Sequence, residues 1–116
     1  MSRIKIKDLC RMAMTEDQGL LVRNAMQPAV KAKEKIILDF EGINLFATMF
    51  FNASIGYYIV NAGIKYCTNN IVLENISDLG LETYMHSFKN AQETIAVGSV
   101  PAVDNNTIVM QNIEES

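Results

Sequence analysis

The chain has 116 residues and a formal net charge of −3 at pH 7, and 49% of its residues are hydrophobic while 20% are charged. This length suffices for one domain with its own core, and the composition argues against disordered, fibrous and membrane-spanning chains. The acidic balance, without a gathered basic face, also argues against a nucleic-acid partner.

The first third of the chain predicts a strand followed by a helix. Residues 3–7 alternate basic and apolar side chains, which is typical of a short edge strand. Thr15 and Gln18 have the spacing of a capping box, in which each side chain bonds the other residue's backbone N–H, so a helix is expected over about 15–31. Pro28 removes an interior N–H, which predicts a kink or an early end just before it.

The middle of the chain is the most apolar part. Residues 36–40 form a continuous run that begins with β-branched side chains, which favours a central strand covered on both faces. Residues 48–62 predict one helix of about four turns, with Gly63 as its left-handed cap. Because this helix is apolar on nearly every side, it needs cover on more than one side, and a second chain is one source. A homodimer therefore remains open.

The last third predicts another strand and another helix. Residues 71–75 read as a buried strand, and Ser77 is suited to cap a helix over about 78–95. The alternation of strands and helices predicts an α/β fold, with a small mixed β-sheet packed against helices. We expect one domain at 1–97 and a C-terminal tail at 98–116, in which a short run has the composition of one strand.

Carboxylates at the end of the central strand invite an enzymatic interpretation. Asp39 and Glu41 precede Gly42, and such a pair can hold Mg²⁺ and accept a phosphoryl group. That chemistry also needs a lysine at a later strand end, where this chain has Glu74 and Asn75. We therefore expect Asp39 to accept backbone N–H bonds of the turn, and we predict that the protein is not an enzyme.

Cofactor, metal and membrane sites are not predicted. Cys10 and Cys67 lie far apart, and His86 is the only imidazole, so nitrogen and sulfur ligands alone cannot complete a zinc site. No stretch is apolar enough for a signal peptide or a membrane span, and a cytoplasmic location is expected.

Four segments carry a resemblance to a known family. They are Asp17–Arg23, Ile36–Ile43, Phe50–Gly56 and Ile71–Ile76. Together they make the chain similar to the bacterial STAS-like domain family of unknown function. The resemblance covers roughly residues 15–95 and implies the STAS-like fold, but it dictates no reaction.

The wider STAS group, which the chain resembles more distantly, includes the anti-sigma factor antagonists. Those proteins bind a histidine-kinase-like ATPase and are switched by phosphorylation of a serine at the helix that follows the central strand. Here Met49 occupies the corresponding turn, and it cannot be phosphorylated. Thr48 stands one position earlier and is a candidate phosphorylation site, although a helix-capping hydroxyl is the simpler interpretation.

The sequence thus favours a non-catalytic regulatory module that docks a protein partner through residues 41–58, with a histidine-kinase-like ATPase as the partner that the resemblance implies. The alternatives are small-ligand or nucleotide sensing at the strand-end crevice and, last, phosphoryl transfer at Asp39. The predicted partner-binding residues are Asn44, Thr48, Phe51, Asn52 and Ser54.

Overall fold

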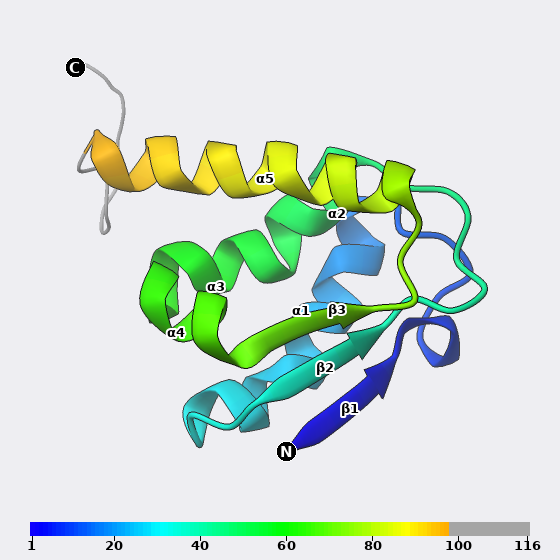
Figure 1. Cartoon of the computed structure of the whole chain (residues 1–116), viewed down its shortest axis with the longest axis horizontal. Coiled ribbons are helices and arrows are strands. Elements are labelled where there is room, and N and C mark those ends of the chain that lie inside the picture. The colour runs from blue at the N-terminus through cyan, green and yellow to red at the C-terminus, as the bar shows by residue number, and fades with distance from the viewer. Residues whose placement is uncertain (98–116) are drawn as a thin grey trace.

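The computed structural model of the chain describes residues 1–97, and they form an α/β fold as predicted. The elements follow one another as β1 (Ser2–Lys5), a 3-10 turn η1 (Ile6–Asp8), α1 (Glu16–Lys31), β2 (Ile36–Asp39), α2 (Thr48–Ala53), α3 (Ile55–Ala62), α4 (Ile64–Asn70), β3 (Ile71–Glu74) and α5 (Asp78–Ala96) (Figure 1). The predicted tail at 98–116, with its short strand, lies outside the described residues. Among residues 1–97, no helix is both long and apolar enough to cross a membrane.

The sheet has the order β1-β2-β3, and both strand pairs are parallel. The expected mixed sheet is therefore wrong for the described part of the chain, although the α/β class is confirmed. Each connection between successive strands contains helices, and a helical crossover returns the chain to the starting edge of the sheet, so all three strands run the same way. All three carboxyl ends consequently lie at one edge.

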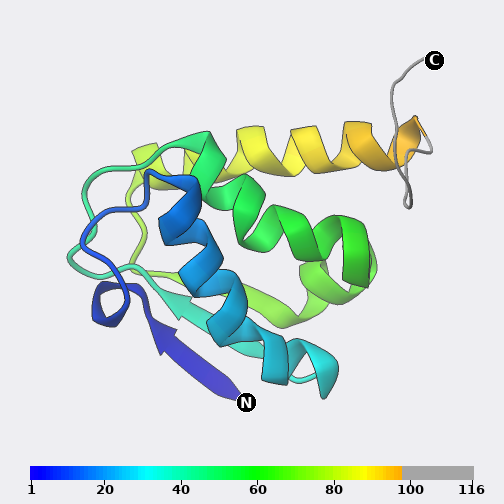
Figure 2. The ribbon, with the colours of Figure 1, turned by 180° about the vertical axis from the view of Figure 1, so that it is seen from behind.

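The two faces of the sheet differ in cover. Ile36 and Leu38 are fully buried in the core cluster, the partly buried Ile4 and Leu73 pack against it, and this face lies against the helices (Figures 1 and 2). The opposite face carries Arg3, which is exposed and pairs in register with Ile37. In Figure 1 no described helix lies in front of that face. The helices of residues 1–97 thus cover one face, and the other carries Arg3 in register with the apolar side chains of Ile37 and Val72.

Helix α1 begins as its sequence predicts and continues beyond the proline. The Thr15 hydroxyl accepts a hydrogen bond from the backbone N–H of Gln18 at 3.1 Å, and the Gln18 side chain accepts from the N–H of Thr15 at 3.0 Å. Pro28 does not end the helix, because it lies in the last turn and the N–H of Ala32 donates to the Pro28 carbonyl. Only one intrahelical bond is lost there, and burial of Met26 and Ala29 stabilises this turn.

The single helix predicted at 48–62 is two helices, with a break at Ser54. The Ser54 hydroxyl donates to the Phe50 carbonyl at 2.9 Å, and its backbone N–H bonds both Phe50 and Phe51 carbonyls. Side-chain competition of this kind bends helices. Gly63 has a φ of 104° and ends α3, as predicted, but helix α4, which follows at once, was not predicted.

Helices α2 and α3 are covered within the chain itself. Phe50, Phe51, Ile55 and Ile59 are fully buried, and α2 packs against α1 while both α2 and α3 pack against α5. The apolar character of this segment therefore needs no second chain as cover. The apolar character of residues 48–62 is therefore no longer a reason to expect a homodimer.

Candidate functional site

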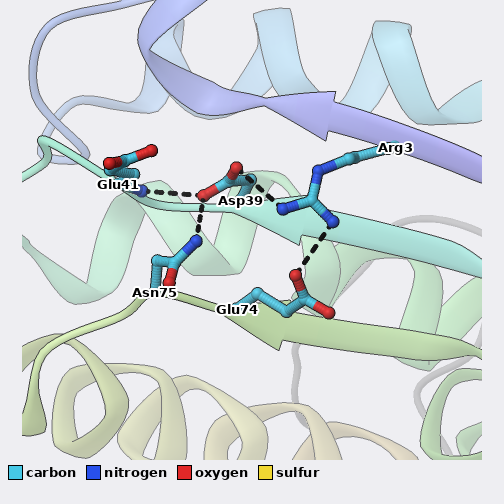
Figure 3. Close-up of polar contacts among 5 residues, drawn as sticks. All are labelled: Arg3, Asp39, Glu41, Glu74 and Asn75. Atoms are coloured by element: carbon cyan, nitrogen blue, oxygen red, sulfur yellow. Dashed lines mark hydrogen bonds and ion pairs between the residues drawn. The ribbon is translucent and has the colours of Figure 1, made fainter.

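Asp39 ends β2 at the carboxyl edge of the sheet, where its carboxylate is fully engaged (Figure 3). One oxygen, Oδ1, accepts from the backbone N–H of Glu41 at 3.0 Å and from the Asn75 amide at 2.9 Å. The other, Oδ2, accepts from the Arg3 guanidinium at 3.0 Å. The guanidinium also donates to Glu74 at 2.9 Å, so the side chains of all three strands are tied together.

These contacts keep Asp39 ionised. The hydrogen bond from Asn75 and the backbone bond from Glu41, opposed by desolvation and helped by Arg3, lower its pKa from 3.8 to about 2. Glu74 and Asp39 in turn raise the pKa of Arg3. Asn75 reaches Asp39 from a backbone with a φ of 56°, a left-handed conformation that asparagine tolerates better than most residues. These contacts tie the ends of the strands together, and we call the group formed by Arg3, Asp39, Glu74 and Asn75 the clasp.

The clasp leaves little of Asp39 for chemistry. Only 4% of the residue is exposed, and both carboxylate oxygens have donors. Glu41 is exposed and contributes its backbone N–H to Asp39 (Figure 3). Over residues 1–97, no three histidine, cysteine or acidic side chains converge in a metal-ligating arrangement. The expected backbone bond to Asp39 is present, but Arg3 and Asn75 were not foreseen as partners.

The turn that leads into α2 is held by a bridge to an earlier segment. Ala13 donates to the Leu45 carbonyl at 2.9 Å, and Ala47 donates to the Ala13 carbonyl at 2.8 Å. Ala47 is the N-cap residue of α2, and no side chain caps this helix. The expected capping role of Thr48 is therefore wrong. Thr48 is the first helical residue and half-buried, and its status as a phosphorylation site stays a prediction.

The predicted docking residues separate into buried and exposed ones. Phe51 and Ser54 have no exposed surface, so a partner cannot contact them in this fold. Asn44 is exposed, and so is Asn52, whose side-chain oxygen accepts from the Ser87 hydroxyl at 2.6 Å. Asn52 thus also holds α2 against α5.

Phe51 lies at the centre of an aromatic cluster, which corrects its predicted role as a surface contact. Its ring is 5.9 Å from that of Phe40, 6.3 Å from Phe46, 5.1 Å from Phe50 and 5.6 Å from Tyr84, measured between centroids. Such spacings are typical of packed aromatic pairs in cores. The short helix α2 turns two consecutive phenylalanines inward, so Met49 is its exposed large apolar side chain.

The sequence pattern did not predict which apolar side chains of this region are exposed. Leu45 is 51% exposed and Met49 is 55% exposed, and both precede the buried pair of phenylalanines. Periodicity identified the segment as apolar, but its orientation depends on the bend at Ser54 and on the bridge at Ala13. No local pattern distinguished Met49 from Phe50.

Met49 borders a pocket between α1 and α2, which we call the α1–α2 pocket, of about 400 Å³. Its lining residues are Glu16, Leu20, Arg23, Met49, Asn52 and Ala53. The two helices approach closely at Gly19, where an added Cβ would stand 2.5 Å from the Phe50 carbonyl oxygen. Glycine here lets the backbones meet, and the pocket opens beside the contact.

The comparisons with known proteins fit this architecture. Residues 18–81 match the family described as STAS-like domain of unknown function. Comparison with curated proteins and with solved structures gives no significant match. The matched region runs from α1 through all of β2 and β3 to the start of α5, and it takes in more than half of the chain. The protein therefore belongs to the family of STAS-like domains of unknown function.

Proposed function

We propose that the protein is a non-catalytic regulatory module that docks a partner protein through the exposed part of residues 41–58. The observation that carries this proposal is the exposure of Met49, which is 55% accessible and lines the α1–α2 pocket. Leu45, in the turn before α2, is a second apolar side chain that is more than half exposed. An exposed apolar side chain beside a pocket is suited to pack against a partner protein. The flexible methionine side chain can also adapt to partner surfaces of different shape. A histidine-kinase-like ATPase is the partner class implied by the distant STAS resemblance.

The clasp at Asp39 supports binding over catalysis. A carboxylate that accepts three hydrogen bonds and lies beside a guanidinium is a poor phosphoryl acceptor, because attack would require it to leave those partners. The same contacts engage the polar side chains at the carboxyl ends of the strands, which is where the alternative of ligand sensing places its site. Cys10 and Cys67 are free thiols, which suits the reducing cytoplasm.

A pair of matched variants tests the proposal. Met49 on α2 and Met85 on α5 are 55% and 52% exposed, so replacing each with aspartate adds the same charge at equal accessibility. Tagged wild type, Met49→Asp and Met85→Asp are expressed in the native host, captured proteins are identified, and affinity is then measured by calorimetry with the purified partner. Circular dichroism confirms that each variant is folded.

We expect the partner to bind wild type and Met85→Asp alike, and Met49→Asp to bind about tenfold or more weakly, as hot-spot residues do. Equal affinity of Met49→Asp and Met85→Asp would contradict docking at α2. Phe51→Asp is unsuitable for this test, because it buries a charge in the aromatic cluster and unfolds the domain.

A further inference from the structure

A second pocket lies between α1 and α3, and it continues the α1–α2 pocket along the same helix. Its volume is about 240 Å³, and Arg23 lines both pockets. Figure 2 shows α1 in front of the sheet with α2 and α3 beside it. The polar and aromatic side chains that line this α1–α3 pocket include Arg23, Gln27, Lys31, Tyr57, Tyr58 and Asn61.

The charge of the α1–α3 pocket is positive, although the whole chain is acidic. Arg23 and Lys31 line it, and no aspartate or glutamate is among its lining residues within the described chain. Over residues 1–97, neither cation lies within ion-pair distance of a carboxylate, whereas Arg3 pairs with two. The pocket therefore offers two cations whose counter-charge this part of the chain does not supply.

The Arg23 side chain is oriented before any ligand arrives. Its guanidinium carbon lies 4.1 Å from the centroid of the Tyr57 ring, which holds the planar group by a cation–π contact. The neighbouring Tyr58 hydroxyl donates to the Arg23 carbonyl at 2.6 Å and fixes α1 against α3 at that point. A guanidinium held in this way loses less entropy when it meets a carboxylate.

The spacing along α1 defines what fits. Arg23, Gln27 and Lys31 are four residues apart and share one face of the helix, so the two cations are separated by roughly 12 Å along its axis. Glu16 lines the opposite end of the combined groove, beside Met49. The two ends of the combined groove therefore differ. Glu16 and Met49 make one end acidic and apolar, and Lys31 makes the other end basic.

We propose that the segment docked by this module is an acidic peptide of the partner protein, which places an apolar side chain against Met49 and carboxylates against Arg23 and Lys31. This inference rests on the proposed function and specifies the partner's chemistry. Glu16 repels the acidic end, so the peptide binds in one direction. Charge complementarity of this kind sets the register of the peptide and raises its association rate.

The test uses a displayed library of random peptides, selected on the intact wild-type protein. We expect enrichment of sequences that combine an apolar residue with aspartates or glutamates at a fixed separation. In a parallel selection, the Arg23→Gln, Lys31→Gln double variant should lose this acidic bias. A Lys89→Gln variant, which removes an exposed cation from α5, should keep it.

One enriched peptide is then synthesised with glutamates or with glutamines. The acidic form should bind wild type about tenfold more tightly than the glutamine form at low salt, and the difference should shrink as salt rises. Equal binding of both forms, no enrichment at all, or enrichment that survives the double variant would overturn the inference. Inorganic phosphate that binds the pocket without peptide enrichment would show a small-anion site instead, and would also overturn it.

The outcomes separate the two proposals. If a partner is captured through Met49 but has no acidic segment in contact, docking stands and the acidic-peptide inference fails. If acidic peptides bind but no host partner depends on Met49, the module recognises acidic peptides and the regulatory docking proposal fails.

Discussion

Replacing Gly19 with alanine tests whether the contact between α1 and α2 is as close as the structure requires. Gly19 is the fourth residue of α1 and is buried against α2. An ideal Cβ at this position would stand 2.5 Å from the Phe50 carbonyl oxygen, 2.8 Å from the Ala53 Cβ and 3.3 Å from the Phe50 carbonyl carbon. Two of these three atoms are backbone, so no rotamer change relieves the overlap, and the helices must separate.

Two opposing terms decide the size of the effect. Glycine to alanine inside a helix stabilises by about 1 kcal/mol, because the unfolded chain loses freedom. Overpacking in a tight contact destabilises by about 1–3 kcal/mol, and the backbone atoms place this site at the upper end. The net expectation is a loss of about 1–2 kcal/mol in the free energy of unfolding, which for a domain of this size lowers Tm by roughly 5–10 °C.

Urea and thermal unfolding of the purified full chain measure this change, and two variants serve as controls. Asn24→Ala replaces an exposed residue on the same helix and should stabilise by about half a kcal/mol, from helix propensity alone. Gly80→Ala meets side-chain atoms of Phe46 and Ile76 and no backbone atom among its three nearest neighbours, so it should cost less than Gly19→Ala. If Gly19→Ala proves as stable as Asn24→Ala, the close approach of α1 and α2 is refuted.

Two further predictions follow from the pKa values. The folded pKa of Asp39, about 2, lies below its ordinary 3.8, so its contribution is fully present above pH 3.8 and is lost as the pH falls through about 2. The stability difference between wild type and Asp39→Asn in urea titrations should therefore shrink over that window, and a constant difference would exclude the clasp. Burial raises the pKa of Cys67 to about 11, whereas Cys10 is less enclosed, so a thiol reagent at pH 8 should modify Cys10 first in the folded protein and both equally in denaturant. Equal native rates would show that Cys67 is accessible.

The sequence determined the features that depend on near neighbours along the chain. The capping box at Thr15, the apolar run that begins at Ile36 and the cap at Gly63 are all present, because each rests on contacts within a few residues. The same local patterns sufficed for the α/β class and for the family resemblance, which the match over residues 18–81 confirms.

The sequence could not determine which apolar side chains face outward. Phe51 was predicted on the docking surface and lies in the core, while Met49 is the exposed residue. The difference arises from the bend at Ser54 and from the Ala13 bridge, 34 residues from Ala47 in the chain. Local periodicity sets whether a residue is helical, but a helix that is apolar on nearly every side does not encode its own rotation.

Tertiary structure alone also assembled both candidate sites. Arg3 and Asn75 are each 36 residues from Asp39, and only the parallel register brings them to its carboxylate. The positive pocket likewise forms because α3 places Tyr57 against Arg23. Interactions between near neighbours in the sequence determined the helices and strands of this protein. Their packing determined which charges are paired among residues 1–97, as Arg3 is with Asp39 and Glu74, and which are not, as with Arg23 and Lys31, since pairing depends on distance in space.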